Sequence, residues 1–113
     1  NPDMVGHTGV YDAIVKAVET VDNNLKEIIE TLLPLGYSFI VIADHGNADY
    51  ALNPDGSPNT AHSLNQVPCV LVYAGNETIT DGVLADVAPT ILALMELTQP
   101  KEMTGKSLIK KGA

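Results

Sequence analysis

Residues 38–46 read SFIVIADHG, and this short stretch decides the fold. Its first part, residues 38–43, is apolar and rich in Ile and Val, which is typical of a strand buried in a parallel sheet. The apolar run stops at Asp44, His45 and Gly46. Open α/β sheets bind their ligands at the carboxyl ends of their strands, so this stop predicts a functional site.

The residues before this strand predict one long helix. Apolar side chains recur at helical spacing over residues 10–33, and charged side chains occupy the opposite face. This pattern indicates an amphipathic helix of about six turns. We expect Thr8 to cap its amino terminus, and residues 34–36, which contain Pro and Gly, to end it.

The residues after the strand begin with a long polar stretch. Residues 44–66 are dense in Asn, Asp, Gly, Pro and Ser, and loops of this length are usually functional. Further elements are predicted as a second apolar strand at 67–73, a brief strand at 78–79, a helix at 86–97 with Pro89 in its first turn, and a tail of loop at 98–113.

This order of elements predicts an α/β fold with parallel strands flanked by helices. Two or three strands alone would leave the edges of the sheet bare, so we expect further strands outside this chain. The chain is therefore expected to be a fragment of a larger domain. The single cysteine, Cys69, lies inside the second apolar strand and is predicted to be a buried thiol.

The charge excludes several partners. Fourteen acidic and six basic residues give a net charge of −8, and none of the basic residues is Arg. A basic surface for nucleic acid is thus excluded, and the apolar runs are far shorter than the roughly 20 residues that span a membrane. Arg is the preferred partner of phosphate, so either the substrate carries no phosphate or its arginines lie outside this chain.

The three histidines are the candidate functional residues. His7 follows Asp3 by four residues, which places both on one face of a helical turn. His45 follows Asp44 directly at the strand end, and His62 lies late in the long loop. These residues can form a metal site or can be solvated loop and capping side chains, and their pattern alone leaves both open. Mixed imidazole and carboxylate ligands would favour Mn²⁺ or Zn²⁺ over Ca²⁺.

Seven segments of the chain form a recognisable set: NPDMVGHTG at 1–9, KAVE at 16–19, ADHGNA at 43–48, TAHS at 60–63, NxVP at 65–68, LADVAPT at 84–90 and MTGKSL at 103–108. Together they resemble the motifs of cofactor-independent phosphoglycerate mutases. The likeness implies that residues 1–113 are the carboxy-terminal portion of the metal-binding domain, with a partial alkaline-phosphatase-like three-layer fold. The amino-terminal nucleophile segment and the phosphotransferase domain would then be absent.

The resemblance also implies a set of metal ligands. Asp3, His7 and His62 would bind one Mn²⁺ ion, and Asp44 and His45 would contribute to a second. An aspartate and the nucleophilic serine, both outside this chain, would complete the second site, so no catalytic residue is assigned here. Zn²⁺ or another divalent ion is the alternative metal, and 2,3-bisphosphoglycerate is not expected as a cofactor.

The implied reaction is the interconversion of 3-phosphoglycerate and 2-phosphoglycerate through a phosphoserine, in cytoplasmic glycolysis and gluconeogenesis. The isolated chain is expected to be inactive and to self-associate through its uncovered apolar face. Two alternatives remain: another metal-dependent phosphomutase or phosphodiesterase of the alkaline phosphatase superfamily, and a non-catalytic metal-binding module.

Overall fold

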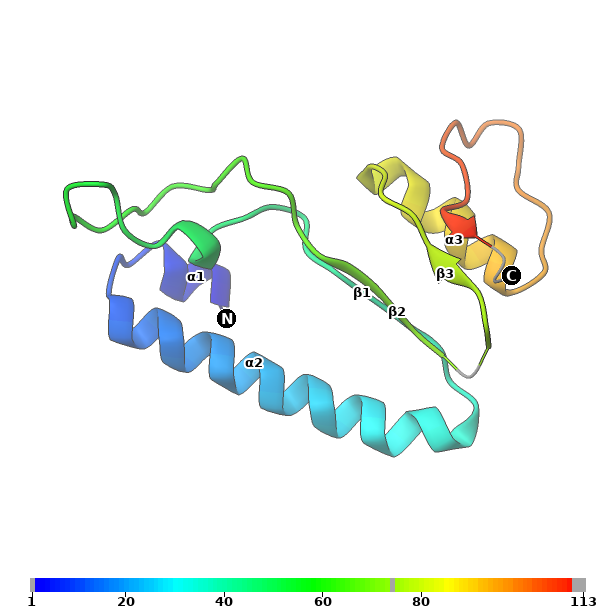
Figure 1. Ribbon diagram of the computed structural model, residues 1–113, viewed down its shortest axis with the longest axis horizontal. Helices are drawn as coiled ribbons and strands as arrows, with labels where there is room; N and C mark the ends of the chain where they lie inside the picture. The colour runs from blue at the N-terminus through cyan, green and yellow to red at the C-terminus, as the bar shows by residue number, and fades with distance from the viewer. Residues whose placement is uncertain (1, 74, 111–113) are drawn as a thin grey trace.

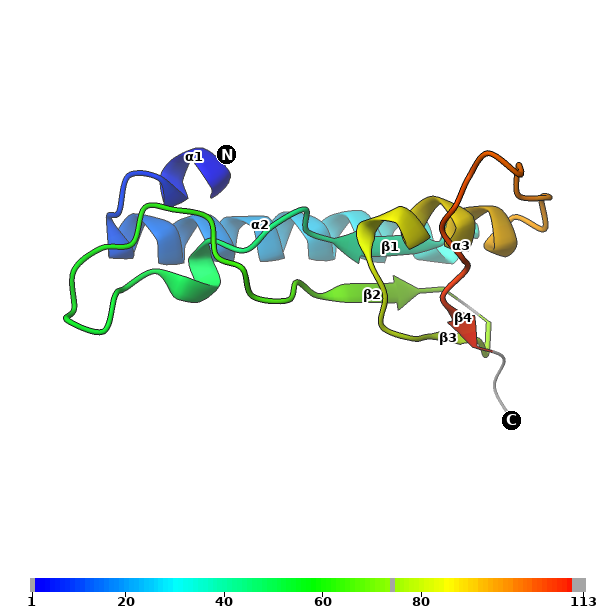
Figure 2. The same cartoon turned by 90° about the horizontal axis from the view of Figure 1, so that it is seen from above.

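The computed structural model describes residues 2–73 and 75–110 as an elongated α/β arrangement (Figure 1). One long helix runs beside a strand pair, and a small helix-and-strand unit lies at the end of that pair (Figure 2). The elements in chain order are α1 (Pro2–Gly6), α2 (Tyr11–Leu32), the 3-10 turn η1 (Leu33–Leu35), β1 (Phe39–Ile42), η2 (Ala48–Tyr50), β2 (Cys69–Val72), β3 (Thr78–Ile79), η3 (Leu84–Asp86), α3 (Val87–Leu94) and β4 (Ile109–Lys110).

The long helix confirms the predicted six turns, because α2 has 22 residues. It ends as predicted, in η1 with Pro34 and at Gly36, whose φ of 94° suits glycine. Its predicted cap is wrong. The N-cap residue is Val10, and the Thr8 hydroxyl instead donates to the Val5 carbonyl at 2.6 Å while accepting from the Val10 amide at 3.3 Å. Thr8 therefore stabilises the turn between α1 and α2.

The two apolar strands pair, but the predicted parallel direction is wrong. β1 and β2 are antiparallel, with Phe39 opposite Val72 and Ile42 opposite Cys69. A parallel pair needs a crossover connection, usually a helix, to return the chain to the same end of the sheet. The only helical element between these strands is the three-residue turn η2. The chain therefore enters β2 beside the end at which it leaves β1, with Cys69 opposite Ile42. The described residues form two two-stranded sheets and no three-layer sandwich.

The second sheet joins the carboxy-terminal segment to α3. The predicted strand at 78–79 is confirmed as β3, which pairs with β4 in the tail that was predicted to be loop. The predicted second helix at 86–97 is confirmed as α3, which is shorter at both ends. Asp86 belongs to η3, and the helix ends at Leu94 because the chain turns at Glu96, whose φ is 57°. Residues 111–113 of the predicted tail, and Asn1 of the opening motif, lie outside the described residues.

A buried carboxylate holds this carboxy-terminal unit together. Asp86 accepts backbone hydrogen bonds from Val83 and from Lys106, both at 3.0 Å. These bonds, with the Lys106 charge, keep the pKa of Asp86 below its usual value. The Thr90 hydroxyl donates to the Asp86 carbonyl at 2.7 Å and accepts from the Leu108 amide at 2.9 Å. The segments 84–90 and 103–108, both part of the family resemblance, thus contact each other and stabilise the fold.

Much of the apolar surface is uncovered. The accessible surface is 8219 Å², whereas a compact protein of this mass exposes about 5,900 Å². The radius of gyration is 16.8 Å, against about 13 Å for a compact chain of this length. Cys69 is exposed, so the predicted buried thiol is wrong: this residue lines an open cavity beside β2. The exposed apolar side chains on the long helix and the strand pair include Val15, Val18, Val21, Ile28, Ile42 and Val70.

The long helix is not a membrane span. Over residues 2–73 and 75–110, no helix combines the length and the apolar character needed to cross a membrane.

Candidate metal centre

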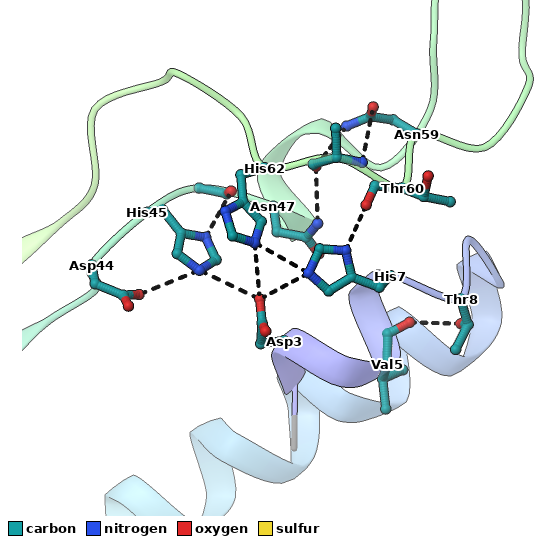
Figure 3. Close-up of polar contacts among 12 residues, drawn as sticks. Asp3, Val5, His7, Thr8, Asp44, His45, Asn47, Asn59, Thr60 and His62 are labelled. Atoms are coloured by element: carbon teal, nitrogen blue, oxygen red, sulfur yellow. Dashed lines mark hydrogen bonds and ion pairs between the residues drawn. The ribbon is translucent and has the colours of Figure 1, made fainter.

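The first two candidate residues lie on one helical turn. α1 continues into His7, whose amide donates to the Asp3 carbonyl at 3.2 Å. This turn places Asp3 Oδ1 3.4 Å from His7 Nε2, as the spacing of four residues predicts. Both side chains are about half exposed, at 52% and 44%. A carboxylate and an imidazole therefore point to the same small volume from one short helix (Figure 3).

The long loop brings His62 to the same point. His62 Nε2 lies 3.1 Å from His7 Nε2 and 3.4 Å from Asp3 Oδ1. Among the described residues these three side chains form the one group whose donor atoms can converge on a single ion. Two ligands bound about 2.1 Å from one ion at tetrahedral angles lie about 3.4 Å apart. The three observed separations match this value, so the donor set fits a divalent metal in both chemistry and spacing.

The hydrogen bonds of His7 determine which ring nitrogen faces this volume. His7 Nδ1 lies 2.7 Å from the Thr60 carbonyl, which can only accept, so Nδ1 carries the proton. The His7 Nε2 lone pair then points at Asp3 and His62. Metal-binding histidines commonly donate their second N–H to a backbone carbonyl in this way. Two ring nitrogens 3.1 Å apart need a proton or a cation between them, since two lone pairs would repel.

The strand-end pair lies beside this group. His45 Nδ1 lies 3.2 Å from the Gly46 carbonyl, which leaves its Nε2 3.4 Å from Asp3 Oδ1 and 3.6 Å from Asp44 Oδ1. The His45 ring stacks on that of His62, with centroids 3.5 Å apart and an angle of 11°. All five candidate residues therefore lie in one region. Asp44 and His45 supply only two possible metal ligands, one fewer than the group of Asp3, His7 and His62.

Two further residues, which the sequence reasoning missed, support the loop that carries His62. Asp49 accepts from the Ser63 hydroxyl at 2.9 Å and from the Asn65 amide at 2.7 Å, and these bonds, that of Asn65 first, hold the pKa of Asp49 below its usual value. Asn47 donates to the Ala61 carbonyl at 3.1 Å (Figure 3). Asn47 falls within the matching segment at 43–48 but was given no role, and the only sequence signal of Asp49 was its place just after that segment, in a loop already dense in Asn and Asp.

An open cavity adjoins the strand-end pair. It has a volume of about 540 Å³ and extends from the carboxyl end of β1 to η3 and α3. Asp44 and His45 line one side, and Leu84, Val87 and Leu108 line the other. The candidate metal centre thus lies next to a space that is large enough for a small molecule or for further protein.

The fold and this donor set indicate a binding site for a divalent metal, and the comparison with protein families agrees. The model of the Metalloenzyme superfamily matches residues 1–99, so the chain belongs to that superfamily.

More specific relatives confirm the resemblance to cofactor-independent phosphoglycerate mutases. A protein of Bacteroides fragilis is 62% identical over 97% of this chain, one of Flavobacterium johnsoniae 55% over 96%, and one of Clostridioides difficile 52% over 98%. Each is named a 2,3-bisphosphoglycerate-independent phosphoglycerate mutase. The chain spans 22% of the length of each of these relatives.

Proposed function

We propose that the protein containing this chain is a 2,3-bisphosphoglycerate-independent phosphoglycerate mutase, which interconverts 3-phosphoglycerate and 2-phosphoglycerate through a phosphoserine. The observation that carries the proposal is the convergence of Asp3 Oδ1, His7 Nε2 and His62 Nε2, at separations of 3.1 to 3.4 Å, in a chain so similar to named mutases. The chain would contribute part of a two-ion centre as the carboxy-terminal portion of the metal-binding domain.

In this proposal Asp3, His7 and His62 hold one Mn²⁺ ion, and Asp44 and His45 contribute to a second. A divalent ion in such a site neutralises phosphoryl oxygens and favours ionisation of an attacking hydroxyl. His7 donates to Thr60 and presents its lone pair, which orients the first site. Asp44, with its side chain 84% exposed beside the cavity, can reach a group that enters from outside this chain.

The nucleophile and the phosphate-binding arginines would lie elsewhere in the parent protein. The chain has no Arg, so it lacks the side chain best suited to bind a phosphate through two hydrogen bonds. Ser63 is the serine next to His62, but its hydroxyl donates to Asp49. For these reasons we assign no catalytic residue to this chain and expect it to be inactive alone.

Metal removal tests the proposal. We expect the parent protein to convert 3-phosphoglycerate without added 2,3-bisphosphoglycerate, to lose activity when a chelator removes its metal, and to regain it with Mn²⁺. His7→Ala and His62→Ala should each weaken Mn²⁺ binding, and the isolated chain should give no turnover. Full activity of the metal-free parent would refute the metal-dependent mutase. Metal binding without phosphomutase activity in the parent would favour the non-catalytic module instead.

A further inference from the structure

The segment that carries His62 does not by itself fix the position of this side chain. His62 belongs to the long connection between β1 and β2, outside any helix or strand, and its side chain is 46% exposed. A metal ligand must be held within about 0.5 Å of its working position by packing or by hydrogen bonds from neighbouring residues. Some other part of the chain must therefore fix this histidine.

The residues that follow His62 are attached to the strand-end turn. The Ser63 amide donates to the Gly46 carbonyl at 2.7 Å, directly after His45. A Cβ atom at Gly46 would lie 2.0 Å from Ser63 Oγ, so the absence of a side chain at Gly46 leaves the room that the Ser63 hydroxyl occupies. The segment carrying His62 and the turn carrying His45 are thus in direct contact.

Asp49 completes this attachment from the far side of the turn. Its Oδ2 atom accepts from Ser63 Oγ at 2.9 Å and from Asn65 Nδ2 at 2.7 Å, and its Oδ1 atom lies 3.2 Å from the same hydroxyl. Both short bonds end on Oδ2, and the negative charge of the carboxylate strengthens each of them; an amide oxygen in its place could accept only two weaker, uncharged bonds.

We infer that Asp49 is the positioning residue for His62: by holding Ser63 and Asn65, it sets where His62 Nε2 lies relative to His7 and Asp3. Asp49 acts through these two neighbours and is not itself a metal ligand. The inference rests on the proposed function, because it takes Asp3, His7 and His62 as the ligands of one divalent ion.

The same loop supplies a matched control. Asp55 accepts from the Ser57 amide at 2.9 Å and from the Ser57 hydroxyl at 2.6 Å. It is, like Asp49, an exposed carboxylate that is bonded to a serine. Its bonds stay within one turn at residues 55–57 and do not reach a residue next to a candidate ligand. Asp55→Asn therefore removes a similar interaction without releasing His62.

The test measures Mn²⁺ affinity in the full-length parent protein by electron paramagnetic resonance. Residues that support metal ligands usually contribute 10- to 100-fold to metal affinity, so Asp49→Asn should weaken binding by roughly 10-fold or more. Asp55→Asn should leave it within about 2-fold. The swapped pair, Asp49→Asn with Asn65→Asp, exchanges donor and acceptor across the same contact and should restore most of the affinity.

The possible outcomes separate this inference from the proposed function. If His7→Ala weakens Mn²⁺ binding and Asp49→Asn does not, the positioning role is wrong and the metal site stands. If neither variant changes the affinity, the metal site fails and the inference fails with it. Should Asp49→Asn not fold, Ser63→Ala and Asn65→Ala each remove one donor and leave the carboxylate. Unchanged affinity in both of these variants would equally overturn the positioning role.

Discussion

Gly105→Ala should detach the carboxy-terminal segment from α3. A Cβ atom at Gly105 would lie 2.0 Å from the Ala85 carbonyl oxygen and 2.6 Å from its carbon, both of them backbone atoms. Ordinary contacts to carbon are about 3.5 Å, so the two backbones would have to separate by about 1.5 Å. The Lys106 amide, 3.0 Å from Asp86, and the Leu108 amide, 2.9 Å from Thr90, would then lose their acceptors.

The size of the effect follows from this overlap. Forcing one methyl group into a well-packed position costs about 1–3 kcal/mol. If the segment opens locally, amide exchange should accelerate about 5- to 150-fold. Hydrogen exchange followed by mass spectrometry, on peptides covering residues 103–110 of the parent protein, measures this directly.

Two comparisons make the result specific. Glu102→Ala changes an exposed side chain in the same segment and should leave exchange unchanged. Exchange in peptides from α1 should also be unchanged in Gly105→Ala, because α1 and this unit lie at opposite sides of the molecule (Figure 1). Wild-type exchange rates in Gly105→Ala would refute the reasoning, since they would mean that the contact with Ala85 is not tight.

Two further predictions concern the pH dependence of the carboxy-terminal unit and the self-association of the isolated chain. Because the folded pKa of Asp86 lies below the usual 3.8, its carboxylate stabilises the fold above that value, and this contribution is lost as pH falls through the folded pKa. Protection of the Lys106 amide should therefore decrease below about pH 4, and Asp86→Asn should flatten that dependence. The isolated 113-residue chain should self-associate and bind a hydrophobic dye, since Val15, Val18 and other apolar side chains are exposed. A monodisperse monomer in sedimentation would contradict this.

The sequence predicted those features that depend on neighbouring residues. Periodicity located α2 and its end at Gly36, and the four-residue spacing placed Asp3 beside His7. The direction of β2 was missed because an apolar run records burial and not the identity or direction of its partner. The contact of His7 with His62 could not be predicted from residue types and spacing, because it depends on the path of the whole loop. Only the family resemblance implied it.

Asp49 was missed for a related reason. A carboxylate in a polar loop is usually solvated, and nothing local distinguishes Asp49 from Asp55. Their difference lies in the partners: Asp55 binds a serine two residues away, whereas Asp49 binds residues 14 and 16 positions further along the chain. Such long-range bonds become visible only in the folded structure.

The contact between His7 and His62 has a consequence for chain entropy. The two residues are 55 positions apart, so anything that joins their ring nitrogens closes a loop of that length. On the model used for disulfides, a permanent link of this span removes about 4 kcal/mol of conformational freedom from the unfolded chain. An ion held by both rings would act as a reversible cross-link of the same kind. Binding of the ion by His7 and His62 would then be coupled to ordering of the whole β1–β2 connection. A change that orders this connection would also raise the affinity for the ion.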